Sequence, residues 1–136
     1  MGLEDRSQTR TIDNVEYKTH PVTFGVGRSI LLKVARAAAP ALKVMMAEGT
    51  AEEKMAGTLA ALTGTLVDAD IAEMAKAFGD ASYYNDGRNM VPLTSMIQEL
   101  HFAGRYDAFL QWLIFCMEVN GFGRFFTTMV NGGGAA

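Results

Sequence analysis

Few residues in this sequence could perform metal or nucleophilic chemistry. The two histidines are His20 and His101, and neither has another histidine, a cysteine or a carboxylate at ligand spacing on the same predicted face, as a zinc site normally shows. Cys116 would need exposure and a nearby base to act as a nucleophile, whereas its neighbours Phe115 and Met117 predict a buried thiol. We therefore predict no catalytic, cofactor or metal site.

Two carboxylate pairs and one glycine-rich stretch have simpler structural explanations. Asp68 with Asp70 and Glu52 with Glu53 both stand at predicted helix starts, where negative charge stabilises the helix dipole. The stretch "GVGRSI" begins like a dinucleotide-binding fingerprint, but Ile30 takes the place of its last glycine and no clean strand leads into it. The sequence contains no Gly-Lys pair, which excludes a Walker-type phosphate loop.

Composition narrows the class of protein further. A chain of 136 residues is most simply one domain. Its net charge is −3 and its basic residues are scattered, so we expect no nucleic-acid partner. The longest apolar segment, residues 109–119, is too short to span a membrane. The first residues lack the apolar core of a signal peptide. The single cysteine cannot form an internal disulfide. We expect a cytosolic protein with no membrane partner.

Periodicity in the first half predicts one strand and two helices. Polar residues 1–11 are expected to form a flexible N-terminus, and the alternation in "VEYKT" predicts a strand over residues 15–19. A helix is predicted from Ser29, interrupted at Pro40. In "TAEEKM", Thr50 and the glutamate three residues later form a capping box, which predicts a second helix.

The second half predicts three more helices and a hairpin. A short amphipathic helix is predicted after Asp68, which can cap it, and before Gly79, which stops it. The turn "NDG" joins a β-hairpin with which the strand at 15–19 could pair. Helices follow over about 95–102 and about 105–120, separated by Gly104. The predicted fold is mainly α with a minor β part. It comprises a single domain over residues 12–126, built from about five helices, a short strand and a hairpin, and a flexible Gly-rich C-terminus over 127–136.

The last predicted helix and the segment after it concentrate the apolar and aromatic residues. The helix is apolar nearly all round, with a narrow polar side at Asp107, Gln111 and Glu118, so it must be covered on most sides. Aromatic residues at helical spacing are usually core, but phenylalanines also continue among glycines beyond the helix. Large exposed apolar surface generally marks an interaction site. We predict partner binding by Phe102, Tyr106, Phe109, Trp112, Leu113, Phe115, Phe122, Phe125 and Phe126.

A family resemblance rests on the same segment. "HFAGRYDAFLQWLIFCMEVNGFGRFF", together with "FGVGRSILLKVARAAAPAL" and the hairpin before "VPL", resembles the small tail assembly chaperones of long-tailed bacteriophages over most of residues 12–126. Its most specific residues are His101, Phe102, Gly104, Arg105, Tyr106, Trp112, Leu113, Phe115, Glu118, Val119, Asn120, Phe125 and Phe126.

The resemblance implies a chaperone without catalysis. Proteins of that family bind the long hydrophobic tape-measure protein in the host cell cytoplasm and are not expected in the mature virion. In some relatives a frameshifted extension recruits the tail-tube protein, and the "NGGGAA" end would suit such a junction. Self-association along the client is also expected.

The sequence leaves two alternative functions open. The chain could be a small structural subunit of a phage particle, a connector or baseplate component, whose apolar end is an oligomer interface. A small-molecule enzyme would require a pocket with His20 or His101 beside a carboxylate.

Overall fold

The computed structural model describes most of the chain. It covers residues 2–46, 49–50, 53, 68–125 and 128, with only the helical backbone for 37–46. Most of the helix predicted after Thr50 therefore lies outside the described residues, but the hydrogen bond from Glu53 N to Thr50 Oγ1 is present at 3.1 Å, as a capping box requires. The chain divides into two compact units, residues 1–27 with 75–136, and residues 28–74.

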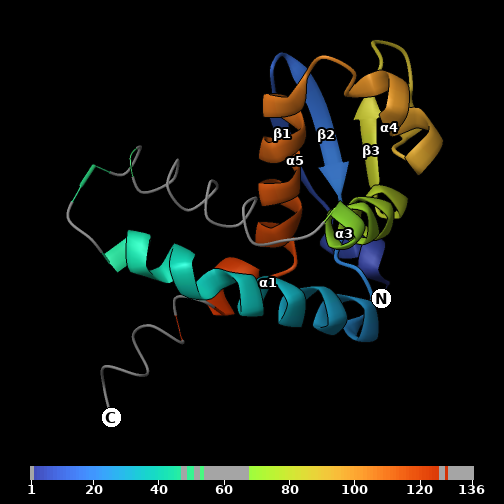
Figure 1. Ribbon diagram of the computed structural model, residues 1–136. Helices are drawn as coiled ribbons and strands as arrows, with labels where there is room; N and C mark the ends of the chain where they lie inside the picture. The colour runs from blue at the N-terminus through green and yellow to red at the C-terminus, as the bar shows by residue number, and fades with distance from the viewer. Residues whose placement is uncertain (1, 47–48, 51–52, 54–67, 126–127, 129–136) are drawn as a thin grey trace. The chain divides into compact units, whose positions relative to one another are not determined.

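A four-stranded antiparallel sheet frames the first unit (Figure 1). Its strands, in spatial order, are β1 (Gln8–Ile12), β2 (Val15–Thr19), β3 (Ser82–Asn85) and β4 (Met90–Pro92). The strand predicted over residues 15–19 and the predicted hairpin are confirmed, and β2 pairs with β3 through Tyr17 opposite Tyr84. The sheet is thus larger than the single strand and hairpin expected from the sequence.

The additional strand comes from the polar N-terminal segment. Residues 8–11, predicted as part of a flexible terminus, form most of β1, and a 3-10 helix at Leu3–Arg6 precedes it. Asp13 and Asn14 close the β1–β2 hairpin with φ angles of 52° and 64°. A two-residue hairpin of type I′ needs positive φ at both central positions, and Asp and Asn accept it more readily than most residues.

The described residues include four α-helices: α1 (Phe24–Met46), α3 (Asp68–Asp80), α4 (Ser95–His101) and α5 (Tyr106–Val119). The predictions for the last two agree with the structure to within one residue, and Gly104 between them has a φ of 73°. Two details of the first two differ. Helix α1 begins five residues before Ser29 and continues across Pro40, and Asp68 is the first helical residue of α3 rather than its cap.

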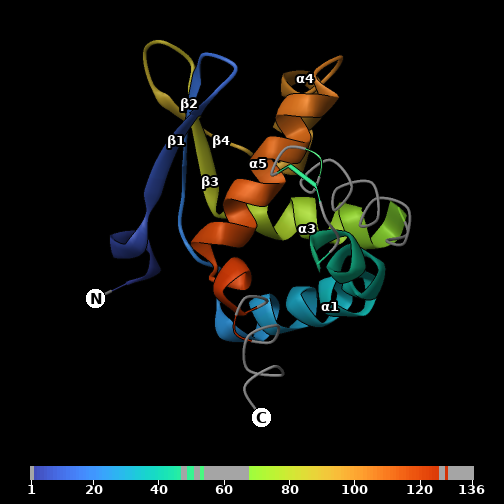
Figure 2. The same ribbon diagram turned by 90° about the vertical axis from the view of Figure 1, so that its left-hand side faces the viewer.

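In the first unit α5 packs against β1 and β2, on one face of the sheet (Figure 2). Buried apolar side chains from the sheet, the end of α3 and α5 make up the core of this unit, including Tyr17, Phe78 and Trp112. In the second unit Lys33 of α1 forms ion pairs with Asp70 and Glu73 of α3. Among the described residues, no helix is both long enough and apolar enough to cross a membrane.

Candidate functional site

The nine residues predicted to bind a partner divide into four groups. Phe109 is half-buried, Tyr106 and Phe125 are 76% and 40% exposed, and Phe126 lies outside the described residues. The side chains of the other five are buried, with exposed fractions of 6% or less: Phe102, Trp112, Leu113, Phe115 and Phe122. The partner-binding role of all nine stays a prediction.

An aromatic cluster lies at the beginning of helix α5. The ring of Phe102, just before α5, lies 5.4 Å from that of Phe109 and 5.5 Å from that of Trp112. Trp112 donates a hydrogen bond from Nε1 to Ser82 Oγ at 3.3 Å, so its polar atom is satisfied inside the core. The exposed side of α5 is the polar side that the sequence predicts, and it includes Asp107, Gln111 and Glu118.

Cys116 is buried in the same core, as predicted. Its Sγ lies 3.7 Å from Ser82 Oγ and 3.9 Å from Thr19 Oγ1, and the two hydroxyl groups are hydrogen-bonded to each other at 2.7 Å. Burial raises the pKa of the Cys116 thiol to about 12. A thiol that stays protonated and inaccessible has no nucleophilic role.

Helix α4 shows the opposite arrangement, because two of its large apolar side chains face solvent. Met96 and Leu100 are 81% and 83% exposed, and the helix has no buried residue. The two residues are one turn apart, and Glu99, also exposed, lies on the same side of the helix. We call Met96, Glu99 and Leu100 the α4 outer face.

Polar contacts hold the other side of α4 in place. Gln98 donates hydrogen bonds from Nε2 to two main-chain carbonyls, Ala75 O at 2.9 Å and Leu93 O at 2.8 Å. Gly79 of α3 makes room for this side chain, since a Cβ there would lie 2.1 Å from Gln98 Nε2 and 2.3 Å from Leu93 O. The glutamine thus fixes the inner side of α4, which leaves the apolar pair outside.

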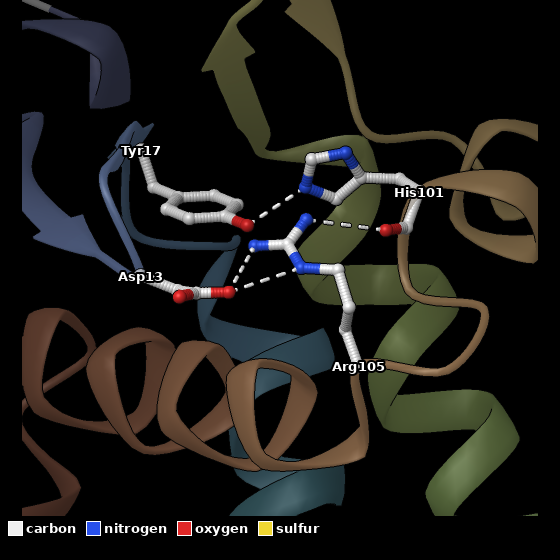
Figure 3. A network of polar contacts seen from close by, with 4 residues as sticks. All are labelled: Asp13, Tyr17, His101 and Arg105. Carbon is white, nitrogen blue, oxygen red and sulfur yellow. Dashed lines mark hydrogen bonds and ion pairs between the residues drawn. The ribbon is translucent and has the colours of Figure 1, made fainter.

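A second set of polar contacts fixes the corner between α4 and α5 (Figure 3). His101 Nε2 lies 2.7 Å from the Tyr17 hydroxyl, and the His101 ring packs 4.1 Å from the Tyr84 ring. Arg105 donates to the His101 carbonyl from Nη1 and to Asp13 Oδ2 from Nε, both at 3.3 Å. Its Nη2 lies 3.2 Å from the same Asp13 oxygen, an ion-pair contact without hydrogen-bond geometry.

The electrostatics of this corner suit a structural role. Burial and the neighbouring Arg105 guanidinium lower the pKa of His101, while burial raises the pKa of Tyr17, although Arg105 partly offsets that rise. Both pKa shifts favour a neutral His101 imidazole that accepts a hydrogen bond from the protonated Tyr17 hydroxyl. The Asp13 carboxylate is bound to Arg105 rather than to His101, so the pair of histidine and carboxylate that an enzyme would need is not formed at this corner.

The sequence model of the phage tail assembly chaperone protein family, TAC, matches residues 13–134 of the chain. The chain belongs to this family. Searches among curated proteins and among solved structures found no match.

Most residues that carry the resemblance to the tail assembly chaperones build the fold. Arg105 joins the α4–α5 corner to the β1–β2 turn, and Glu118 forms an ion pair with Arg10 of β1. Asn120 accepts a hydrogen bond from Val22 N at 2.9 Å and donates one to Cys116 O at 2.8 Å. In the described residues, this block therefore supplies more of the scaffold than of the exposed apolar surface.

Sequence reasoning missed the α4 outer face as a candidate site. Met96 and Leu100 were available as an apolar pair at i and i+4 in "SMIQELH", but such a pair ordinarily faces the core. The signal that could have found them is Gln98 on the opposite side of the same helix. A glutamine whose amide is satisfied by the main chain allows the polar side to face inward.

Proposed function

We propose that this chain is a non-catalytic tail assembly chaperone that binds and shields the hydrophobic tape-measure protein. The observation that carries the proposal is the exposure of Met96 and Leu100 on a helix that is fixed from its polar side. Family membership supports the general role in tail assembly. The exposed pair supplies a surface on which an apolar client can bury its own side chains.

The size of this surface fits a chaperone that must also release its client. Burying a large aliphatic side chain contributes roughly 1.5–3 kcal/mol, so two such residues give weak binding once the costs of association are subtracted. Several copies bound along one long client would then hold it through multivalency. Weak individual contacts allow the copies to leave when the tail tube replaces them.

Among the predicted partner-binding residues, Tyr106 is the best placed to join this contact. Tyr106 is the first residue of α5, at the α4–α5 corner, whereas Phe125 belongs to the helical turn over residues 122–125, after the opposite end of α5. The buried members of the set, such as Trp112 and Phe115, contribute by keeping the scaffold rigid. A rigid scaffold lowers the entropic cost of presenting an apolar face.

The remaining expectations follow from the same role. We propose that the protein acts in the host cell cytoplasm and is absent from the mature virion. An extended form made by frameshifting would recruit the tail-tube protein. The rival role, a small connector or baseplate subunit, predicts instead that the protein remains in finished particles.

The test is co-expression of the tagged chain with the tape-measure protein encoded beside it, followed by affinity capture and by analysis of purified particles. We expect capture of the client, loss of capture in the double variant Met96→Ser/Leu100→Ser, and absence from particles. Leu32→Ser is the matched control, because Leu32 is 53% exposed but lies on α1 in the other unit. Stable incorporation into particles without client capture would establish the structural subunit instead.

A further inference from the structure

We infer that the α4 outer face takes the apolar side of an amphipathic helix whose flanks carry lysine or arginine. The inference rests on the proposed function and specifies the kind of client segment that binds. It has two parts: the shape of the apolar surface on α4, and the charge around it.

The shape of the surface suits a helix. Met96 and Leu100 form a short apolar ridge one turn long on a regular α-helix. Side chains at i and i+3 or i+4 of a second helix would pack on either side of such a ridge, as in ordinary helix–helix packing. An extended strand binds by adding to the edge of a sheet, and the α4 outer face is the surface of a helix rather than a sheet edge.

The exposed charges beside the ridge along the chain are acidic. Glu99 lies on the α4 outer face, Asp107 lies in the first turn of the next helix, α5, and both are exposed. Arg105 is the only lysine or arginine between residues 94 and 107, and its guanidinium is held by Asp13. Lysine or arginine beside the apolar stripe of a client would be attracted to these carboxylates, whereas aspartate or glutamate would be repelled.

The same charges argue against two other occupants. An antiparallel pair of α4 helices from two copies would bring their glutamates to one interface, where like charges oppose association. An anionic lipid surface would be repelled by the same two carboxylates. A basic helix is the partner for which both the apolar pair and its charged surroundings are favourable.

The experiment uses the full chain and two synthetic amphipathic helical peptides with the same leucine stripe, one flanked by lysine and the other by glutamate. Binding is measured by fluorescence anisotropy of the labelled peptides at low and at high salt. We expect the lysine peptide to bind about tenfold more tightly at low salt and this preference to shrink at high salt, because salt screens exposed charges. Leu100→Ser should weaken binding of both peptides, and Leu32→Ser should weaken neither.

A second variant tests the contribution of charge to binding without changing the fold. Glu99→Gln with Asp107→Asn removes both carboxylates at nearly constant shape, and it should abolish the preference for lysine while leaving an apolar contribution that Leu100→Ser still reduces. Equal affinity for the two peptides, or a preference unchanged in the neutral variant, would overturn the inference. So would a dimer in sedimentation velocity that Leu100→Ser dissociates, because the face would then be occupied by a second copy.

Capture of the tape-measure protein distinguishes failure of this inference from failure of the proposed function. If the client is captured through Met96 and Leu100 but the peptides show no charge preference, the function stands and the basic partner is rejected. If neither the client nor the peptides bind, both the proposed function and this inference are wrong.

Discussion

Helices α4 and α5 follow one another in the chain and both contain large apolar residues. These residues face the core in α5, whereas Met96 and Leu100 of α4 face solvent. In α5 the apolar residues pack on the sheet and the exposed side is polar. In α4 the inner side is polar, held by Gln98 and His101, and Met96 and Leu100 are exposed. The apolar content of a segment therefore does not show whether its side chains are exposed, and in α4 the anchored polar side leaves Met96 and Leu100 outside.

The two helices should differ most in how strongly a substitution in each lowers the stability of the protein. Trp112→Ala should lower the free energy of unfolding by about 3–5 kcal/mol, because it leaves a cavity in the core under α5 and removes one of the hydrogen bonds of Ser82 Oγ. Urea unfolding followed by circular dichroism measures the change. A loss below about 1 kcal/mol would show that α5 is not the core element described above.

The anchor of α4 can be broken from the neighbouring helix. Gly79→Ala places a methyl group against Gln98 Nε2 and Leu93 O, and it should cost about 1–3 kcal/mol and weaken client capture, since α4 must shift. The control is Gly25→Ala, where a Cβ would meet no atom within 4 Å. Equal stability of the two variants in urea would mean that Gln98 does not need the space left by Gly79.

The α4–α5 corner should respond to pH through His101. Its pKa is lowered in the folded state, so the unfolded chain binds the proton more readily, and stability is lost as the pH falls below the ordinary value of 6.5 toward the folded pKa. The loss should be smaller than about 1 kcal/mol, since the ring is half-buried and solvent screens its charge. Urea unfolding at pH 7.5 and pH 5 should show a larger loss in the wild type than in His101→Gln. An identical loss in both proteins would assign the pH dependence to other groups.

The smallest effect on stability should come from the α4 outer face itself. Leu100→Ser should change the free energy of unfolding by no more than about 0.5 kcal/mol, because the side chain is 83% exposed. The comparison with Trp112→Ala in the same urea experiment tests the division of roles between the two helices. A loss of several kcal/mol for Leu100→Ser would place this leucine in a core rather than on a surface.

Local sequence patterns predict much of this fold, including α5 with its polar side, the strand at Val15 and the hairpin after it. These elements follow from short-range periodicity and turn residues. Strand β1 was not predictable in the same way, because only Ile12 of its five residues is buried and the others lack an apolar alternation. It is defined by pairing with β2 across the Asp13–Asn14 turn.

The candidate site was less predictable than the fold, since it depends on contacts between distant segments. Periodicity places Met96 and Leu100 on one side of α4 but cannot say which side faces the core. That choice depends on two carbonyl acceptors for Gln98, one from α3 and one from the segment after β4, and on a glycine at position 79. Conversely, the aromatic residues of α5 resemble a binding surface in the sequence, but a four-stranded sheet is present to cover them.

The most direct test of the central claim compares capture of the tape-measure protein by three forms of the chain with equal folding stability. These are the wild type, Met96→Ser/Leu100→Ser and the control Leu32→Ser. If the α4 outer face binds the client, the double variant loses capture by at least about tenfold, a change of 1.4 kcal/mol, while the control captures as the wild type does. Undiminished capture by the double variant would show that the client binds elsewhere.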